Sequence, residues 1–305
     1  MDRPHPTTGG HPARRAAGRT ARVAAAAALV VLASAVVAVA QDPFDDGGGP
    51  RLRFGGGRIQ GPARDPEPDR FELVRVRYDS VGSEMEAYYY YRGRVWHRWE
   101  TDFPEAEVNF GRRVAELSRV RTSPFILDRR LIDDDIFDYP FLIMSDVGWM
   151  TLDDTEIARL REFLLRGGFL WADDFWGDAE WQNFEDVMRR VLPDVVPREV
   201  PLDHALLHTV FDVYEVPLIP ARDFATPDGR GREREDFHRH PVGDMQTAHL
   251  RGWLDAAGRP MVIATHNTDV GDGFERQDYG QWYFERYSTR AYQLGLNVVV
   301  YALLH

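Results

Sequence analysis

The fold of this chain is decided by Pro140-Phe-Leu-Ile-Met-Ser-Asp146 and the residues that follow it as far as Gly177. Two short apolar runs, 141–145 and 169–172, enclose a segment at 152–166 whose apolar residues have the spacing of one helix face. Thr151 is expected to cap this helix, and Gly167-Gly168 ends it because glycine readily adopts the left-handed conformation there. Strand, helix and strand form a βαβ unit, so the two strands should be parallel.

Further segments extend this unit to one α/β domain over residues 70–305, a three-layer sandwich with a mostly parallel central sheet. The apolar patterns predict strands in 71–78, 249–254 and 260–265, and helices in 105–119, 178–191 and 288–304.

The N-terminal residues have the pattern of a secretory signal. Arginines precede the apolar run Val23–Ala40, which ends in Ala38-Val39-Ala40, the small-x-small pattern of a signal-peptidase site. Residues 1–40 are therefore predicted to be a signal peptide cleaved after Ala40, which places the mature protein in the periplasm or outside the cell. The alternative is an uncleaved membrane anchor.

Residues 41–69 are rich in Gly, Pro and Asp and are predicted to form a flexible linker, because they cannot bury enough apolar surface to become ordered. No later segment is expected to span a membrane after signal cleavage. The net charge of −12 argues against nucleic-acid partners. The absence of Cys excludes disulfides, Cys-ligated zinc and a cysteine nucleophile.

Polar residues follow each predicted strand, where ligands bind in sheets of this kind. The candidates for catalysis are Asp173, Asp174 and His266, and those for binding are Trp99, Asp102, Asp146, Asn267 and Asp269. Because the strand ends meet at one edge, Asp102, Asp173, Asp174 and Asp269 should surround one cleft, with Trp99 and His266 nearby. Structural roles remain open for three of them: a helix cap for Asp174, core packing for Trp99 and a structural role for His266.

The stretch Asn267-Thr-Asp-Val-Gly-Asp-Gly-Phe-Glu275 invites comparison with a calcium loop. The EF-hand pattern fails, because Gly271 occupies a ligand position and Asp272 occupies the usual glycine position. A tight Gly-rich turn is expected here, and no residue is assigned as a metal ligand.

Several separated motifs resemble the DUF4159 family, a bacterial domain of unknown function. They are Trp99-Glu-Thr-Asp-Phe-Pro104, Gly167-Gly-Phe-Leu-Trp-Ala-Asp-Asp-Phe175, Asn267–Glu275 and Leu294-Gly-Leu-Asn297. The resemblance covers about residues 70–305 and implies a flavodoxin-like sandwich similar to class I glutamine amidotransferase-like and ThuA-like domains. It implies no established activity, and glutaminase chemistry is excluded because the relatives' Cys nucleophile is missing.

The favoured function is therefore an exported domain without glutaminase activity that binds a polar ligand, such as a carbohydrate, in an acidic cleft edged by aromatic residues. One alternative is a hydrolase with paired carboxylates, in which Asp173 or Asp174 is the general base. This hydrolase would act with or without a divalent metal, and the sequence identifies no cofactor. The other is a non-catalytic scaffold with protein partners in the cell envelope.

Overall fold

A computed structural model describes residues 69–84, 86–91, 93–220, 225 and 243–305. The predicted signal peptide and the predicted linker up to residue 68 lie outside the described residues. None of the helices in these described ranges is both long and apolar enough to cross a membrane.

The described part of the chain is built on a seven-stranded sheet with the order β5-β1-β6-β8-β11-β10-β9. Its strands are β1 (Val74–Arg77), β5 (Leu127–Arg130), β6 (Phe141–Ser145), β8 (Phe169–Asp173), β9 (Arg198–Glu199), β10 (His249–Leu254) and β11 (Pro260–His266). The five strands from β5 to β11 are parallel, whereas β10 is antiparallel to β11 and β9 to β10. The predicted mostly parallel sheet is confirmed.

The βαβ unit forms as the sequence predicts. Strands β6 and β8 pair in parallel register and are joined by α3 (Asp154–Leu165), after which Gly167 has a φ of +100°. The predicted cap is wrong: Asp153, not Thr151, accepts a hydrogen bond from the Glu156 amide at 2.8 Å. Thr151 instead lies in the short strand β7 (Met150–Thr151), which pairs with β2 (Asp79–Ser80), so its backbone is already extended before the helix begins.

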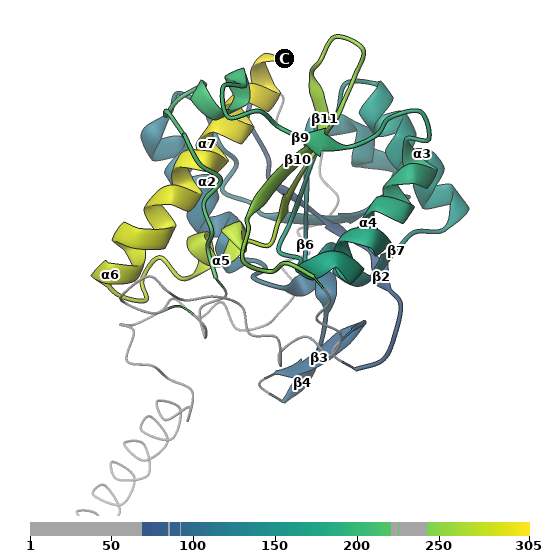
Figure 1. The fold of residues 1–305 in the computed structure, drawn as a ribbon. Helices are drawn as coiled ribbons and strands as arrows, with labels where there is room; N and C mark the ends of the chain where they lie inside the picture. Colours follow the sequence, from purple (N-terminus) through teal and green to yellow (C-terminus); the bar gives the residue numbers. More distant parts are fainter. Residues whose placement is uncertain (1–68, 85, 92, 221–224, 226–242) are drawn as a thin grey trace, which may run out of the picture. The chain divides into compact units, whose positions relative to one another are not determined.

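Helices cover both faces of the sheet (Figure 1). On one face lie α3 and α4 (Gly177–Val191), and on the other α2 (Glu105–Leu117), α5 (Val270–Glu275) and α7 (Thr289–Leu304). Side chains alternate along β8: Leu170 and Ala172 pack toward α3 and α4, and Phe169 and Trp171 toward α2 and α7. This alternation sets the direction of polar side chains that are the last residues of their strands, such as Asp173.

The predicted helices α2, α4 and α7 begin and end within two residues of their expected limits. A two-stranded sheet of β3 (Tyr88–Tyr91) and β4 (Arg94–His97) stands apart from the main sheet. The remaining elements are η1 (Arg98–Glu100), η2 (Asp134–Asp138), η3 (Val147–Trp149), η4 (Ala205–His208), α6 (Gln281–Tyr283) and η6 (Phe284–Ser288).

Candidate acidic site

The carboxyl ends of β6, β8 and β11 meet at one edge of the sheet because the three strands are parallel. The first residue after each strand has a left-handed backbone, with φ values of 58° at Asp146, 58° at Asp174 and 59° at Asn267. Asp102, in the turn before α2, has a φ of 63°. Asp and Asn are the residues other than glycine that adopt this conformation most readily.

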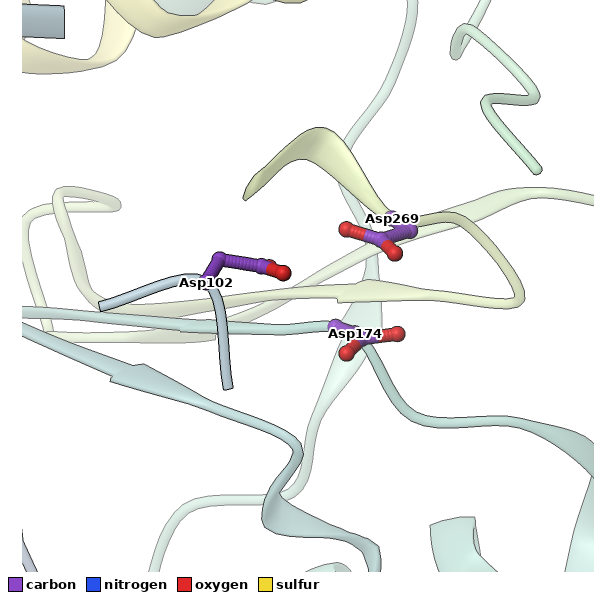
Figure 2. Close-up of side chains that lie close together, drawn as sticks. All are labelled: Asp102, Asp174 and Asp269. Carbon is purple, nitrogen blue, oxygen red and sulfur yellow. The ribbon is translucent and has the colours of Figure 1, made fainter. Parts of the chain in front are cut away.

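Three carboxylates from separate segments converge at this edge (Figure 2). Asp102 comes from the turn between η1 and α2, Asp174 follows β8, and Asp269 is the N-cap of α5. One oxygen from each lies within 4.8 Å of the others. Asp174 and Asp269 are 8% and 3% exposed, and Asp102 is half-buried as a residue although its Oδ2 atom is buried.

Local hydrogen bonds fix two of these carboxylates. Asp269 accepts a hydrogen bond from the Asp272 amide at 2.6 Å, which caps α5, and Asp174 accepts one from the Trp176 indole at 2.9 Å. Asp102 Oδ2 is buried and has no hydrogen-bond partner among the described residues. A Cβ atom at Gly271 would lie 2.5 Å from this oxygen, so only glycine lets the α5 backbone approach Asp102 so closely.

A second group shares Asp102 with the first and adds Asp272 and Glu275. Arg276 lies 3.1 Å from Asp272 Oδ1 and 2.8 Å from Glu275 Oε2, so a guanidinium already offsets this part of the negative charge. The expected tight turn over 267–275 is wrong, because residues 270–275 form α5.

Sequence analysis therefore missed Asp272 and Glu275 as members of the acidic site. The signal was present in the spacing, since positions 269, 272 and 275 are three residues apart and share one face of a helix. The comparison with a calcium loop did not reveal this three-residue spacing. That pattern requires alternate residues as ligands rather than every third residue.

Burial and mutual repulsion disfavour the charged forms of these groups. Burial, followed by the charges of Asp272, Glu275 and Asp174, raises the pKa of Asp102 well above its usual range. Burial and the charges of Asp174 and Asp102 do the same to the pKa of Asp269. Burial raises the pKa of Glu275 to about 7, although Arg276 opposes the change.

Asp173 lies at the same edge, but its side chain is directed into the protein. It is 1% exposed and accepts hydrogen bonds from the Thr265 hydroxyl and, at 2.8 Å, from the Gly271 amide. This direction follows from strand alternation, since Asp173 shares a face of β8 with Trp171. Burial raises the pKa of Asp173 to about 6 against the opposing effect of these hydrogen bonds.

Asp146 forms a separate buried ion pair. Its Oδ2 atom accepts hydrogen bonds from Arg98 at 2.7 Å and from the Thr101 hydroxyl at 2.9 Å. Burial raises the pKa of Asp146, and the Arg98 guanidinium opposes that change. Asp146 is thus engaged in holding the segment before Asp102 against the sheet.

His266 lies on the opposite face of the sheet from Asp173, where its ring packs against Phe175 and Trp181. Arg251 donates to Nδ1 at 3.2 Å, so Nε2 carries the hydrogen and donates to the Gly177 carbonyl at 3.0 Å. Burial lowers the pKa of His266 to about 3, and the ring is neutral at physiological pH. Both ring nitrogens are engaged within the protein.

Asn267 links three segments at the same edge. Its Oδ1 accepts a hydrogen bond from the Gly177 amide at 2.8 Å, and its Nδ2 donates to the carbonyls of Asp244 at 2.7 Å and Thr247 at 3.0 Å. The side chain is fully buried. These contacts give Asn267 a structural role.

Trp99 is half-buried and packs against the core on the α3 and α4 side, with its ring centroid 5.8 Å from that of Phe103. Of the eight candidates, the structure thus brings Asp102, Asp174 and Asp269 into one carboxylate group. It gives Asp146, Asp173, His266, Asn267 and Trp99 contacts within the fold instead.

The geometry of the three-carboxylate group suits a hard divalent cation. Ca²⁺ takes oxygen ligands at about 2.3–2.6 Å, so two ligands on opposite sides are about 4.6–5.2 Å apart. Each pair of ligand oxygens lies within 4.8 Å, so the three carboxylates are close enough together to share one such ion. Mg²⁺, with ligands at about 2.0–2.1 Å, fits within the same limit, since two of its ligands on opposite sides are about 4.0–4.2 Å apart.

A search of curated proteins finds no match to this chain. Residues 73–303 match the family model described as "Domain of unknown function (DUF4159)". This match covers most of the sequence, and the chain therefore belongs to the DUF4159 family.

Proposed function

We propose that this domain binds a divalent cation, Ca²⁺ or Mg²⁺, through Asp102, Asp174 and Asp269, and that the cation holds a polar ligand. The observation that carries the proposal is the convergence of three carboxylates, largely removed from solvent, on one space (Figure 2). Three buried negative charges repel one another unless protons or a cation offset them. A cation provides this compensation at neutral pH.

The remaining coordination positions are open to a ligand. Ca²⁺ takes six to eight oxygen ligands, and three carboxylates binding through one oxygen each leave at least three positions for other oxygens. Asp102 is the most exposed of the three residues, which supports entry of a ligand from its side. Neighbouring hydroxyl groups of a carbohydrate are oxygen ligands of this kind, which supports the proposed carbohydrate class.

A second candidate function, a metal-dependent hydrolase, is favoured by Glu275. Its carboxyl belongs to the group that shares Asp102, and its pKa of about 7 suits proton transfer at neutral pH. A bound cation would lower the pKa of its water, and Glu275 would accept the proton. In this version Glu275 replaces Asp173 as general base, because both Asp173 oxygens already accept hydrogen bonds. The domain uses no glutaminase chemistry in either version.

Calorimetric titration of the chelator-treated protein with CaCl₂ and with MgCl₂ tests the cation site. We expect saturable binding and, at a concentration one hundred times the Kd, stabilisation by about 2.7 kcal/mol. Asp269→Asn is the sharpest variant, because asparagine retains the N-cap function at α5 while removing one charge. It should fold normally and bind the cation at least tenfold more weakly.

Asp194→Asn is the matched control, since Asp194 is exposed and its replacement changes the net charge equally. Wild-type affinity in this variant separates a local site from a general effect of charge. No binding at millimolar concentrations, or equal affinity in the Asp269 and Asp194 variants, would refute the cation site. That outcome would favour the non-catalytic scaffold.

The proposal also includes export of the protein from the cytoplasm. The motif Ala38-Val39-Ala40 supports cleavage before Gln41, so that the acidic site works in the periplasm or outside the cell. N-terminal sequencing of protein from its natural host should begin at Gln41. A mature chain that retains Val23–Ala40 would instead be membrane-anchored.

A further inference from the structure

A small cavity lies behind the acidic site, on the α2 and α5 side of the sheet. Its polar lining consists of Arg75, Glu107, Ser145 and Asp173, and Phe110 and Phe274 contribute apolar walls. Arg75, Ser145 and Asp173 come from the adjacent parallel strands β1, β6 and β8. The space is on the scale of one water molecule.

Two polar atoms in this lining have no protein partner among the described residues, Glu107 Oε2 and Ser145 Oγ. Their residues are 1% and 2% exposed. The other oxygen of Glu107 accepts from Arg75 Nε at 2.7 Å and lies 2.5 Å from Nη2, so the ion pair satisfies only one side of the carboxylate. A buried polar atom without a hydrogen bond is costly, and native proteins rarely leave one unsatisfied.

Asp173 completes the polar lining. Its oxygens accept hydrogen bonds from Thr265 and Gly271, and a carboxylate oxygen has a second lone pair that can accept another. The lining therefore offers two carboxylates that accept hydrogen bonds and one hydroxyl that donates. A water molecule has the complementary set, with two hydrogens to donate and two lone pairs to accept with.

We propose that this cavity is a binding site for one ordered water molecule, which donates to Glu107 Oε2 and to Asp173 and accepts a hydrogen bond from Ser145 Oγ. The water joins the Arg75–Glu107 ion pair to Asp173 in one network. Since Asp173 also holds the Gly271 amide, this network supports the start of α5 from inside the protein. The inference is independent of the proposed cation site.

Thermal unfolding of the Ser145→Ala variant tests this inference. The direction in which its Tm shifts from that of the wild type distinguishes a bound water from a dry cavity. If water is bound, the variant loses a hydrogen bond and its Tm should fall by about 2–4 °C. If the cavity is dry, the variant removes an unsatisfied hydroxyl and its Tm should rise. Ser288→Ala is the matched control, because Ser288 is also fully buried and its Oγ has no partner among the described residues, but it does not line the cavity.

A crystal structure of the wild-type protein at a resolution that shows ordered water provides a second measurement. We expect one density peak within hydrogen-bonding distance of both Glu107 Oε2 and Ser145 Oγ. A cavity without density in that crystal would overturn the inference. So would a rise in Tm for Ser145→Ala that equals the rise for Ser288→Ala.

Discussion

Replacement of Asp173 by asparagine should reverse the usual expectation for a buried, hydrogen-bonded aspartate. The Asn amide oxygen can accept from the Gly271 amide, as Asp173 Oδ2 does at 2.8 Å. Its NH₂ group can donate to Thr265 Oγ, whose own hydrogen can turn to the Ala172 carbonyl at 3.2 Å. Asparagine can therefore keep the contacts with Gly271 and Thr265 while it removes the charge of Asp173.

The magnitude follows from the pKa of Asp173, which is 3.8 in the unfolded chain and about 6 in the folded protein. Between these values the folded state binds more protons than the unfolded state, so the free energy of unfolding falls as pH rises. The difference corresponds to about 3 kcal/mol lost in total as the pH rises from well below 3.8 to above 7. The side-chain amide of the Asp173→Asn variant does not titrate, so the variant avoids this loss.

Urea unfolding followed by circular dichroism, with chelator present at each pH, measures the effect. At pH 4.5 the Asp173→Asn variant should match the wild type within about 1 kcal/mol, and by pH 7.5 it should exceed the wild type by about 2–3 kcal/mol. The other titrating carboxylates are common to both proteins, so most of their contributions cancel in the difference; Asp269 is the exception, because the charge of Asp173 helps to raise its pKa. Asp173→Ala leaves the Gly271 amide without an acceptor and should lose about 1–3 kcal/mol throughout.

Two results would refute this reasoning. A difference between Asp173→Asn and wild type that does not change from pH 4.5 to pH 7.5 would mean that burial does not raise the pKa of Asp173. Destabilisation of the Asn variant as large as that of the Ala variant at every pH would mean that the amide cannot adopt the exchanged hydrogen bonds.

Three further predictions concern other residues at this edge. Arg98→Met leaves Asp146 buried without its cation and should cost about 3–5 kcal/mol in urea unfolding; a change below about 1 kcal/mol would show that water replaces Arg98. Because burial lowers the pKa of His266 to about 3, its ring NMR signals should not change between pH 5 and pH 8, whereas a titration midpoint near 6 would contradict its neutral state. Gly271→Ala places a Cβ 2.5 Å from Asp102 Oδ2 and should weaken cation binding in calorimetry at least tenfold, and wild-type affinity in this variant would exclude Asp102 as a ligand.

The sequence predicted the fold well because its signals are local. Apolar runs, helix periodicity and the glycine after α3 identified the βαβ unit and the parallel pairing of β6 with β8. The two errors have different causes, the first a contact with a distant segment and the second a local hydrogen bond. Pairing of Thr151 with β2 moved the cap to Asp153, and the hydrogen bond from the Asp272 amide to Asp269 turned an expected loop into α5.

The site was less predictable, because topology places a residue at a sheet edge without fixing the direction of its side chain. Asp173 and Asp174 are neighbours in sequence, yet strand alternation directs the first into the core and a left-handed backbone directs the second to the carboxylate group. The engagement of Asp146 by Arg98 depends on residues 48 positions apart. A residue pattern within a single segment cannot predict such a long-range ion pair.

The left-handed backbone at Asp102, Asp146, Asp174 and Asn267 also limits how this protein can vary. For most residue types, this conformation raises the free energy of the folded state by about 1–2 kcal/mol. A saturation library selected for folding should therefore retain Asp, Asn and Gly at these positions. Asp269 differs, because its φ is −115° and its structural task is to cap α5. It should also accept Asn, Ser and Thr, which are preferred N-cap residues as well. Homologues that have lost the charge of this site should thus carry glycine or asparagine at 102 and 174, but asparagine, serine or threonine at 269.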